Sequence, residues 1–201
     1  LMRNRMGQLD NWTEEFLIDE TFPIAKSDQE IVSLVNSGIT LMRVASGNIH
    51  RTLGGKRNSN AALPTTGTLC HIDLGCIQLA NEQFYFASHC SLRRNYFSTK
   101  GVLVMNAEFY KNRRLSVRGH PGDGKFEVLT SELKLSQYLL ASKRSESGNH
   151  LPHPDLKVRT TAQYEVSFPN QMRVYADGRL IGRSDEVEIS VVSRAVKVVI
   201  A

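Results

Sequence analysis

A short loop of small and polar residues, Ser46-Gly47-Asn48, lies between an apolar segment over 40–45 and a segment over 49–54 that could begin a helix. A strand–loop–helix turn of this kind leaves backbone N–H groups that can hold a phosphate. The same composition is also typical of an ordinary turn. The loop is therefore a candidate phosphate site, with a plain turn as the alternative.

The segment Asp177-Gly178-Arg179 is a second candidate. An Asp-Gly pair between two apolar runs predicts a two-residue hairpin turn, with the glycine at positive φ. Asp177 could also serve as a general base, because a carboxylate accepts a proton near neutral pH whereas the guanidinium of Arg179 stays charged. Arg179 could instead bind a phosphate through paired N–H groups.

Other residues have the chemistry of metal ligands. Asp123-Gly124 is typical of a turn, and its carboxylate oxygen is a ligand type that Mg²⁺ or Ca²⁺ takes. His150 and His153 are three residues apart, but prolines at 152 and 154 force an extended path, so we interpret this segment as architectural.

The three cysteines give two alternatives. Cys70, Cys76 and Cys90, with His89, could bind zinc, although the sequence has no Cys-x2-Cys pair. An odd and small number of cysteines argues against a disulfide framework and favours free buried thiols.

The first third of the chain has the pattern of a small α/β unit. Ser27 and Glu30 have the spacing of a capping box, which predicts a helix that Gly38 ends. The segment over 12–18 is amphipathic, and Thr13 could cap a short helix there. Residues 54–67 are rich in turn formers and predict a loop or linker. The apolar residues at helical spacing after the capping box are Ile31, Val32, Leu34 and Val35.

From residue 68 onward, strand patterns dominate, and several alternate apolar with polar residues as in sheets with one wet face. One helix is expected over 131–141. We therefore predict a β-rich α+β fold: a truncated α/β region over 1–60 and a two-layer antiparallel β-sandwich over 68–201. The expected strands lie at 69–74, 83–87, 101–106, 125–129, 156–160, 162–168, 171–176, 186–192 and 195–200.

Composition sets limits on partners and location. The net charge of +5 favours anionic partners such as nucleotides or an acidic membrane surface. The basic residues are scattered and no nucleic-acid-binding pattern is present, so we expect no nucleic acid partner. No apolar run is long enough to cross a bilayer and no signal pattern begins the chain, so the expected location is the cytoplasm.

The order and spacing of three segments resemble the C-terminal domain of the diacylglycerol kinase-like lipid kinases, a family that transfers phosphate from ATP to a membrane lipid hydroxyl. The resemblance extends over 101–200 and, in part, over 27–55. The segments are GHPGDGKFEV at 119–128, GNHLPHPDLKV at 148–158 and MRVYADGR at 172–179.

The resemblance implies roles for particular residues. Ser46, Gly47, Asn48 and Arg51 match a family segment, Gly-Thr-Gly-Asn-Asp-Phe-Ala-Arg, that helps to bind the nucleotide. Asp28 is the one residue shared with the family's Gly-Gly-Asp-Gly-Thr, and it too is implied near ATP. The implied Mg²⁺ ligands are the Asp123 side chain with the carbonyl groups of His120 and Lys125.

The chain also departs from the family pattern. The family's Asp-Gly-Glu, whose Glu is the proposed base, reads Asp177-Gly178-Arg179 here. The nucleotide segment lacks the Asp that follows the Asn in the family and is one residue shorter. Two functions stay open. One is an ATP-dependent lipid kinase acting at a membrane surface, with a homo-oligomer as a possible state. The other is a non-catalytic regulatory module that recognises lipid, nucleotide or a protein.

Overall fold

The computed structural model describes residues 13–55, 65–95, 98–110, 113–116, 119–133, 137 and 155–201. Over these residues the chain is mostly strand, which confirms the expected β-rich α+β class. The helices are α1 (Asp28–Asn36) and α2 (Asn48–Thr52). The strands are β1 (Thr13–Ile18), β2 (Ile24–Ala25), β3 (Leu41–Val44), β4 (Thr65–Leu79), β5 (Glu82–Phe86), β6 (His89–Arg93), β7 (Lys100–Met105), β8 (Phe109–Tyr110), β9 (Arg113–Arg114), β10 (Phe126–Glu132), β11 (Leu156–Thr161), β12 (Gln163–Ala176) and β13 (Arg179–Ile200).

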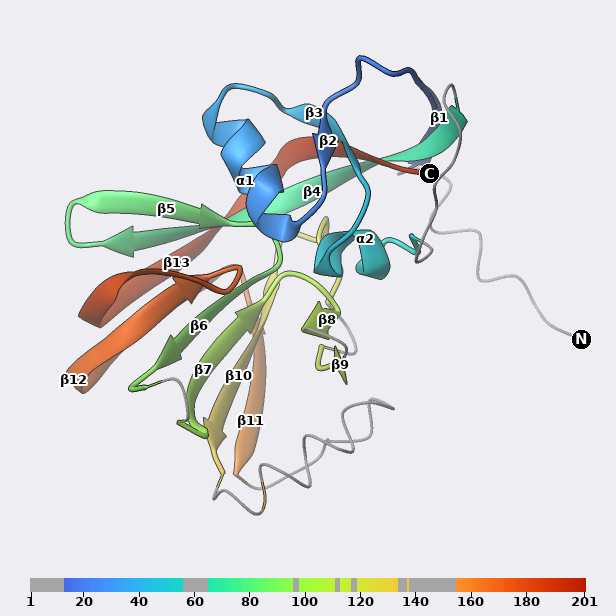
Figure 1. Ribbon diagram of the computed structural model, residues 1–201. Helices are drawn as coiled ribbons and strands as arrows, with labels where there is room; N and C mark the ends of the chain where they lie inside the picture. Colours follow the sequence, from blue (N-terminus) through green and yellow to red (C-terminus); the bar gives the residue numbers. More distant parts are fainter. Residues whose placement is uncertain are drawn as a thin grey trace, which may run out of the picture.

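A single, largely antiparallel sheet runs through most of the described chain (Figure 1). Its strands follow the order β1-β4-β13-β12-β6-β7-β10-β11, and β5 pairs with β4. The α/β part joins this sheet through β3, which runs parallel to β13 and pairs with β2 on its other side. The short strands β8 and β9 form a separate two-stranded sheet.

A β-bulge bends the long strand β13. Its pairing with β4 shifts between Val192 and Val196, where Arg194 has a φ of +51°. A bulge of this kind kinks a strand and increases its twist. Val187, before the bulge, packs in one hydrophobic core, and Val198, after it, packs in another. One strand therefore serves two cores.

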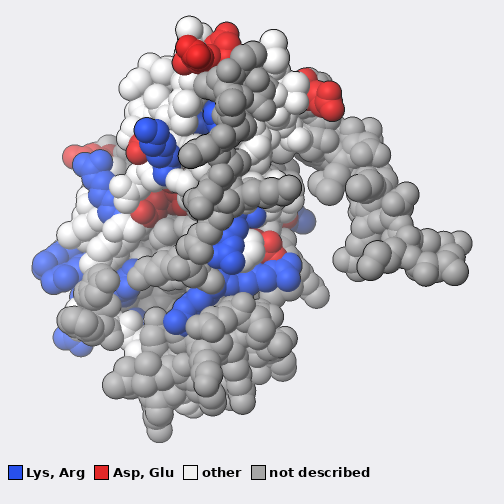
Figure 2. Space-filling view, turned by 45° about the vertical axis from the view of Figure 1, so that its right-hand side comes forward, with Lys and Arg blue, Asp and Glu red and all other residues white. Residues whose placement is uncertain are grey.

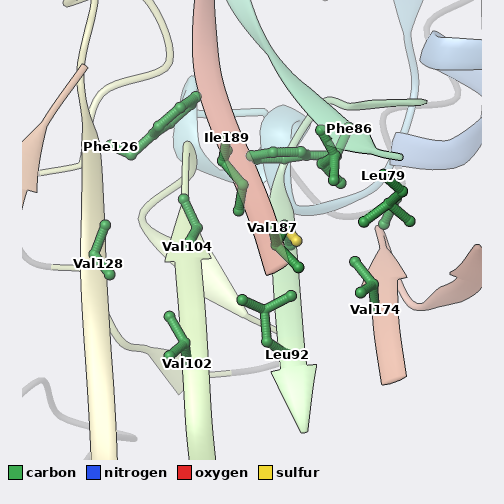
Figure 3. Close-up of a cluster of buried hydrophobic side chains, with 13 residues drawn as sticks. Leu79, Phe86, Leu92, Val102, Val104, Phe126, Val128, Val174, Val187 and Ile189 are labelled. Carbon is green, nitrogen blue, oxygen red and sulfur yellow. The ribbon is translucent and has the colours of Figure 1, made fainter. Parts of the chain in front are cut away.

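The first core lies between two layers of the folded sheet (Figure 3). Its side chains come from β4, β5, β6, β7, β10, β12 and β13. Phe86 of β5 and Phe126 of β10 are both buried, with ring centroids 5.5 Å apart. Two β layers with an apolar interior are the sandwich that the alternating strands predict.

The second core attaches the α/β part to the same sheet. Ile31 of α1, Met42 of β3 and Ile49 of α2 are fully buried and cluster with Ile72 of β4 and Val198 of β13. Both helices therefore lie against the end of the sheet that β4 and β13 build, as Figure 1 shows.

Local signals at two turns were predicted correctly. The side chain of Ser27 caps α1 by accepting the N–H of Glu30 at 3.2 Å. At the hairpin between β12 and β13, Ala176 pairs with Arg179. Asp177 and Gly178 form its turn with φ of +45° and +86°, as a type I′ hairpin requires.

The helix expected from Thr13 is wrong, because residues Thr13–Ile18 form β1, which pairs antiparallel with β4. Ile18 is fully buried and Leu17 is 67% exposed, so the segment follows the two-residue period of a strand. The runs at 162–168 and 171–176 are one strand, β12, with an irregularity between Ser167 and Met172. The runs at 186–192 and 195–200 likewise both belong to β13.

Parts of other expectations lie outside the described residues. Residues 131 and 132 end β10 instead of beginning a helix. Apart from 133 and 137, the remainder of 131–141 is not described, nor are 56–64 of the expected linker and 148–154 of the histidine segment.

The described surface carries its cations in several separate groups on the face shown in Figure 2. This distribution fits the scattered basic residues of the sequence. Neither of the described helices is long and apolar enough to cross a bilayer.

We predict that Phe86→Ala lowers the free energy of unfolding by about 3–5 kcal/mol, because it leaves a cavity against Phe126 in the sandwich core. Leu17→Ala, at a mostly exposed position, serves as the control and should change stability by less than about 0.5 kcal/mol. Urea unfolding measures both. Equal effects of the two substitutions would contradict this core assignment.

Candidate functional site

The Asp28 carboxylate holds the loop that precedes α2. Its two oxygens accept the backbone N–H groups of Asn48 at 2.9 Å and Ile49 at 3.0 Å. Gly47 has a φ of +109°, and a Cβ there would lie 2.5 Å from Asp28 Oδ1, so only glycine fits. The Ser46 hydroxyl donates to the carbonyl of Lys26. Four residues implied near the nucleotide (Asp28, Ser46, Gly47 and Asn48) are therefore gathered in one place.

This arrangement limits how the loop could hold a phosphate. The N–H groups of Asn48 and Ile49 are already used by Asp28. A phosphate would therefore have to be bound by other groups of the loop. Arg51, the fifth residue implied there, has its guanidinium 4.0 Å from the centre of the Phe109 ring, in a cation–π contact with β8.

The Asp177 carboxylate holds a second loop, the turn between β5 and β6. It accepts three backbone N–H groups, from Ala87 at 2.7 Å, Ser88 at 2.8 Å and His89 at 2.9 Å. The backbone N–H of Asp177 in turn donates to the carbonyl of His89 at 2.9 Å. Its side chain is therefore used on another loop and not within its own hairpin.

Two further contacts connect these loops across the sequence. The Asn48 side-chain amide donates to the Ser88 hydroxyl at 3.0 Å, and Gln29 of α1 donates to the carbonyl of Asp177 at 2.8 Å. The Ser88 Oγ lies 2.7 Å from His89 Nδ1. We call the connected set Asp28, Asn48, Ser88, His89 and Asp177 the junction network.

Burial controls the electrostatics of the junction network. Burial, and secondarily the neighbouring Asp28 carboxylate, raises the pKa of Asp177 to about 7, although its three N–H donors act in the opposite direction. Burial also raises the pKa of Asp28, against the N–H groups that it accepts. Two carboxyl groups that influence each other are typical of functional sites.

A second acidic loop surrounds Asp123. Its side chain accepts the backbone N–H of Lys125 at 3.0 Å, and its own N–H donates to the carbonyl of His120 at 3.3 Å. The neighbouring Gly124 donates its N–H to Asp73 at 2.7 Å. Burial is the largest cause that raises the pKa of Asp123, and Asp73 adds to it.

The implied Mg²⁺ ligands can be compared with this loop. The Asp123 carboxylate and the carbonyl groups of His120 and Lys125 are all oxygen donors, which fit a hard cation. Among the described residues, no three His, Cys, Asp or Glu side chains form a metal cluster. The carbonyl groups would therefore have to supply a large share of any metal site here.

The zinc hypothesis is wrong for Cys70, Cys76, His89 and Cys90, because these described residues form no such cluster. All three cysteines are free thiols. Cys90 is fully buried in the sandwich core, and burial raises the pKa of its thiol.

Two buried residues that connect the loops, Asp73 and Asn106, were not among the residues predicted from the sequence. Asn106 donates its side-chain amide to the carbonyl groups of Asp73 and Ala87, both at 2.8 Å. Asp73 accepts the N–H of Arg194 at 2.6 Å and so fixes the bulge of β13. A charged residue inside the apolar run of β4 was the available signal for Asp73.

Comparisons with known proteins support a lipid kinase-like fold. No protein-family model and no curated protein matches the chain. Among solved structures, a chain provisionally assigned as a diacylglycerol kinase from Bacillus anthracis str. Sterne is similar with a TM-score of 0.63 and 11% identity. The match covers 89% of this chain and 77% of that one.

Two more structures from the same organism agree. A second provisionally assigned diacylglycerol kinase has a TM-score of 0.61 and 10% identity, over 89% of this chain and 77% of that one. A diacylglycerol kinase has a TM-score of 0.54 and 11% identity, over 80% and 67%. These three matches confirm that the chain has the fold of the diacylglycerol kinase-like proteins that its sequence segments resemble.

We predict that, above pH 7, Asp177→Asn lowers the free energy of unfolding by about 1–3 kcal/mol, because the new amide NH₂ faces backbone donors. The raised pKa of Asp177 also determines the direction in which stability changes with pH. Since the folded pKa of Asp177 is raised to about 7, the folded chain binds an extra proton between pH 4 and 7, and stability falls as pH rises through that range.

The stability advantage of the wild type over Asp177→Asn should therefore shrink from pH 4 to pH 7 and stay constant above it. Chemical unfolding of both proteins at a series of pH values measures this difference. Subtracting the variant's free energy of unfolding from that of the wild type removes the contribution of all other titrating groups. An advantage that grows with pH would contradict the raised pKa.

Proposed function

We propose that the chain is an ATP-dependent phosphotransferase that phosphorylates diacylglycerol or a related lipid hydroxyl at a membrane surface. The observation that carries this proposal is the junction network, in which the Ser46-Gly47-Asn48 loop and the Asp177 hairpin meet although they lie far apart in the sequence. The similarity of the fold to bacterial diacylglycerol kinase structures supports it.

In this proposal, one group of described residues binds the nucleotide and another binds the Mg²⁺ that phosphoryl transfer uses. Gly47, with no Cβ, allows close approach of the nucleotide beside Asp28, and Arg51 supplies positive charge near the phosphates. Asp123 with the carbonyl groups of His120 and Lys125 would hold Mg²⁺, which neutralises phosphate charge when bound.

A second candidate is a non-catalytic module that binds nucleotide, lipid or a partner. Arg179 stands where the resemblance implies the catalytic Glu, and a guanidinium cannot accept a proton. Both oxygens of Asp177 also accept backbone N–H groups, which engages the nearest carboxylate. Both observations favour a non-catalytic module, because they leave no carboxylate at this hairpin available as a general base.

Transfer of labelled phosphate from Mg-ATP to diacylglycerol in mixed micelles tests the kinase, and Gly47→Ala tests the site. We expect transfer by the wild-type chain and a fall of about 100-fold in the variant, because the Cβ displaces Asp28 and the nucleotide loop. Gly38→Ala is the matched control: it carries similar backbone strain, but its Cβ meets nothing within 4 Å, so transfer should persist.

The outcomes separate the two candidates. Absence of transfer by the wild-type chain would overturn the kinase proposal. If Mg-ATP then still raised the melting temperature, the binding module would be favoured. Equal transfer by the Gly47→Ala and Gly38→Ala variants would remove the loop from the site.

A further inference from the structure

Three arginines lie in one row across neighbouring strands of the main sheet. Arg173 of β12 pairs with Arg93 of β6 on one side and with Arg183 of β13 on the other. The three strands are neighbours in the order β13-β12-β6, as Figure 1 shows. Residues that pair directly across antiparallel strands share a face of the sheet. The row therefore places three positive charges on one face.

This row lies on the face that turns away from the sandwich core. Leu92 and Val174, which adjoin the row on β6 and β12, both pack in that core. Since side chains alternate along a strand, the arginines point to the opposite side. Among the described residues, Arg173 and Arg183 form no salt bridge. Like charges directly opposite each other destabilise a sheet, so a bound anion would offset a cost that this row imposes.

An aromatic and an apolar side chain continue the row toward the Asp177 hairpin. Tyr175 precedes core residue Ala176 on β12 and pairs with Leu180 of β13, so both side chains share the face of the arginines. The Arg93 guanidinium lies 4.9 Å from the centre of the Tyr175 ring. Leu180 is 48% exposed. Cations and an exposed apolar side chain are therefore combined on one surface.

We propose that this surface, which we call the arginine face (Arg93, Arg173, Arg183 and Leu180), docks on a membrane that contains anionic lipid. This inference rests on the proposed kinase function and names the face that meets the lipid. The guanidinium groups of Arg173 and Arg183 bind lipid phosphates through paired N–H groups. Leu180 enters the boundary between headgroups and acyl chains.

The exposed leucine favours lipid over a nucleic acid as the anionic partner. Its side chain gains free energy by leaving water for the acyl boundary, whereas a nucleic acid backbone offers it no apolar partner. Leu180 also adjoins the Asp177 hairpin, so a membrane docked here brings a lipid hydroxyl close to the junction network. The nearest acids along β13, Asp185 and Glu186, come after Arg183 and so lie farther from the hairpin.

Co-sedimentation of the full chain with vesicles, in the absence of ATP, tests the arginine face. One set of vesicles is phosphatidylcholine alone, and the other is equal parts of phosphatidylcholine and phosphatidylglycerol. We expect binding to the anionic set only, and it should weaken as salt is added. The double variant Arg173→Gln/Arg183→Gln should bind about 25-fold more weakly, or about fivefold for each cation. Leu180→Ser should bind about tenfold more weakly.

The matched control removes the same charge from the other face of the sheet. Lys157 and Arg159 of β11 are exposed, and Arg159 pairs with Val128, which packs in the sandwich core. Lys157→Gln/Arg159→Gln should therefore bind anionic vesicles within about twofold of the wild type. All of these variants should keep the wild-type melting temperature, because each changes an exposed or partly exposed side chain.

The outcomes separate this surface from the kinase. Equal losses in the two double variants, or equal binding to both vesicle sets, would overturn the arginine face. Retention on duplex DNA that needs the arginines, without vesicle binding, would also overturn it in favour of a nucleic acid partner. Phosphate transfer by a wild-type chain that binds no anionic vesicles would overturn the face and leave the kinase. Vesicle binding lost only in the arginine-face variants, in a chain that transfers no phosphate, would support the face and overturn the kinase.

Discussion

Acceptance of three backbone N–H groups by the buried Asp177 carboxylate is the interaction on which the rest of the site depends. A buried charge is costly unless it is hydrogen-bonded, and here the turn between β5 and β6 supplies the donors. The same three hydrogen bonds fix the conformation of this turn. Because β5 and β6 belong to opposite layers of the sandwich, this contact also fixes where the first core closes.

The Asp28 carboxylate also accepts backbone N–H groups, those of Asn48 and Ile49, on the α/β side of the junction network. It caps α2, and through Ser88 and Asn48 it contacts the turn that Asp177 holds. Asp28 and Asp177 thus help to fix the α/β part against the sandwich. Burial raises the pKa of both carboxyl groups. A site assembled from loops held in this way is pre-organised, which is what the proposed phosphoryl transfer would require.

The features that could be predicted from sequence are those that depend on residues close together in the chain. The capping box of Ser27 and the Asp177-Gly178 turn are local, so their residues specify them. The helix at Thr13 failed because pairing with β4 decides that segment. The gathering of Asp28 with Asn48 followed from the resemblance.

The part of the site that could not be predicted depends on contacts between distant segments. The bonds from Ala87 and Ser88 to Asp177 join residues about 90 positions apart, and Gln29 reaches Asp177 across 148. No local pattern encodes such pairs, and a turn aspartate usually bonds within its own turn. Asp73 and Asn106 could be read only as polar residues in apolar runs, without their partners.

Native-state hydrogen exchange tests the central claim most directly. If the two carboxylates hold these loops, the amides of Ala87, Ser88, His89, Asn48 and Ile49 should exchange only through global unfolding, with the same free energy as the buried strands of the sandwich. Fast exchange of these five amides, as in loops open to solvent, beside slow exchange of β6 and β13 would contradict the account.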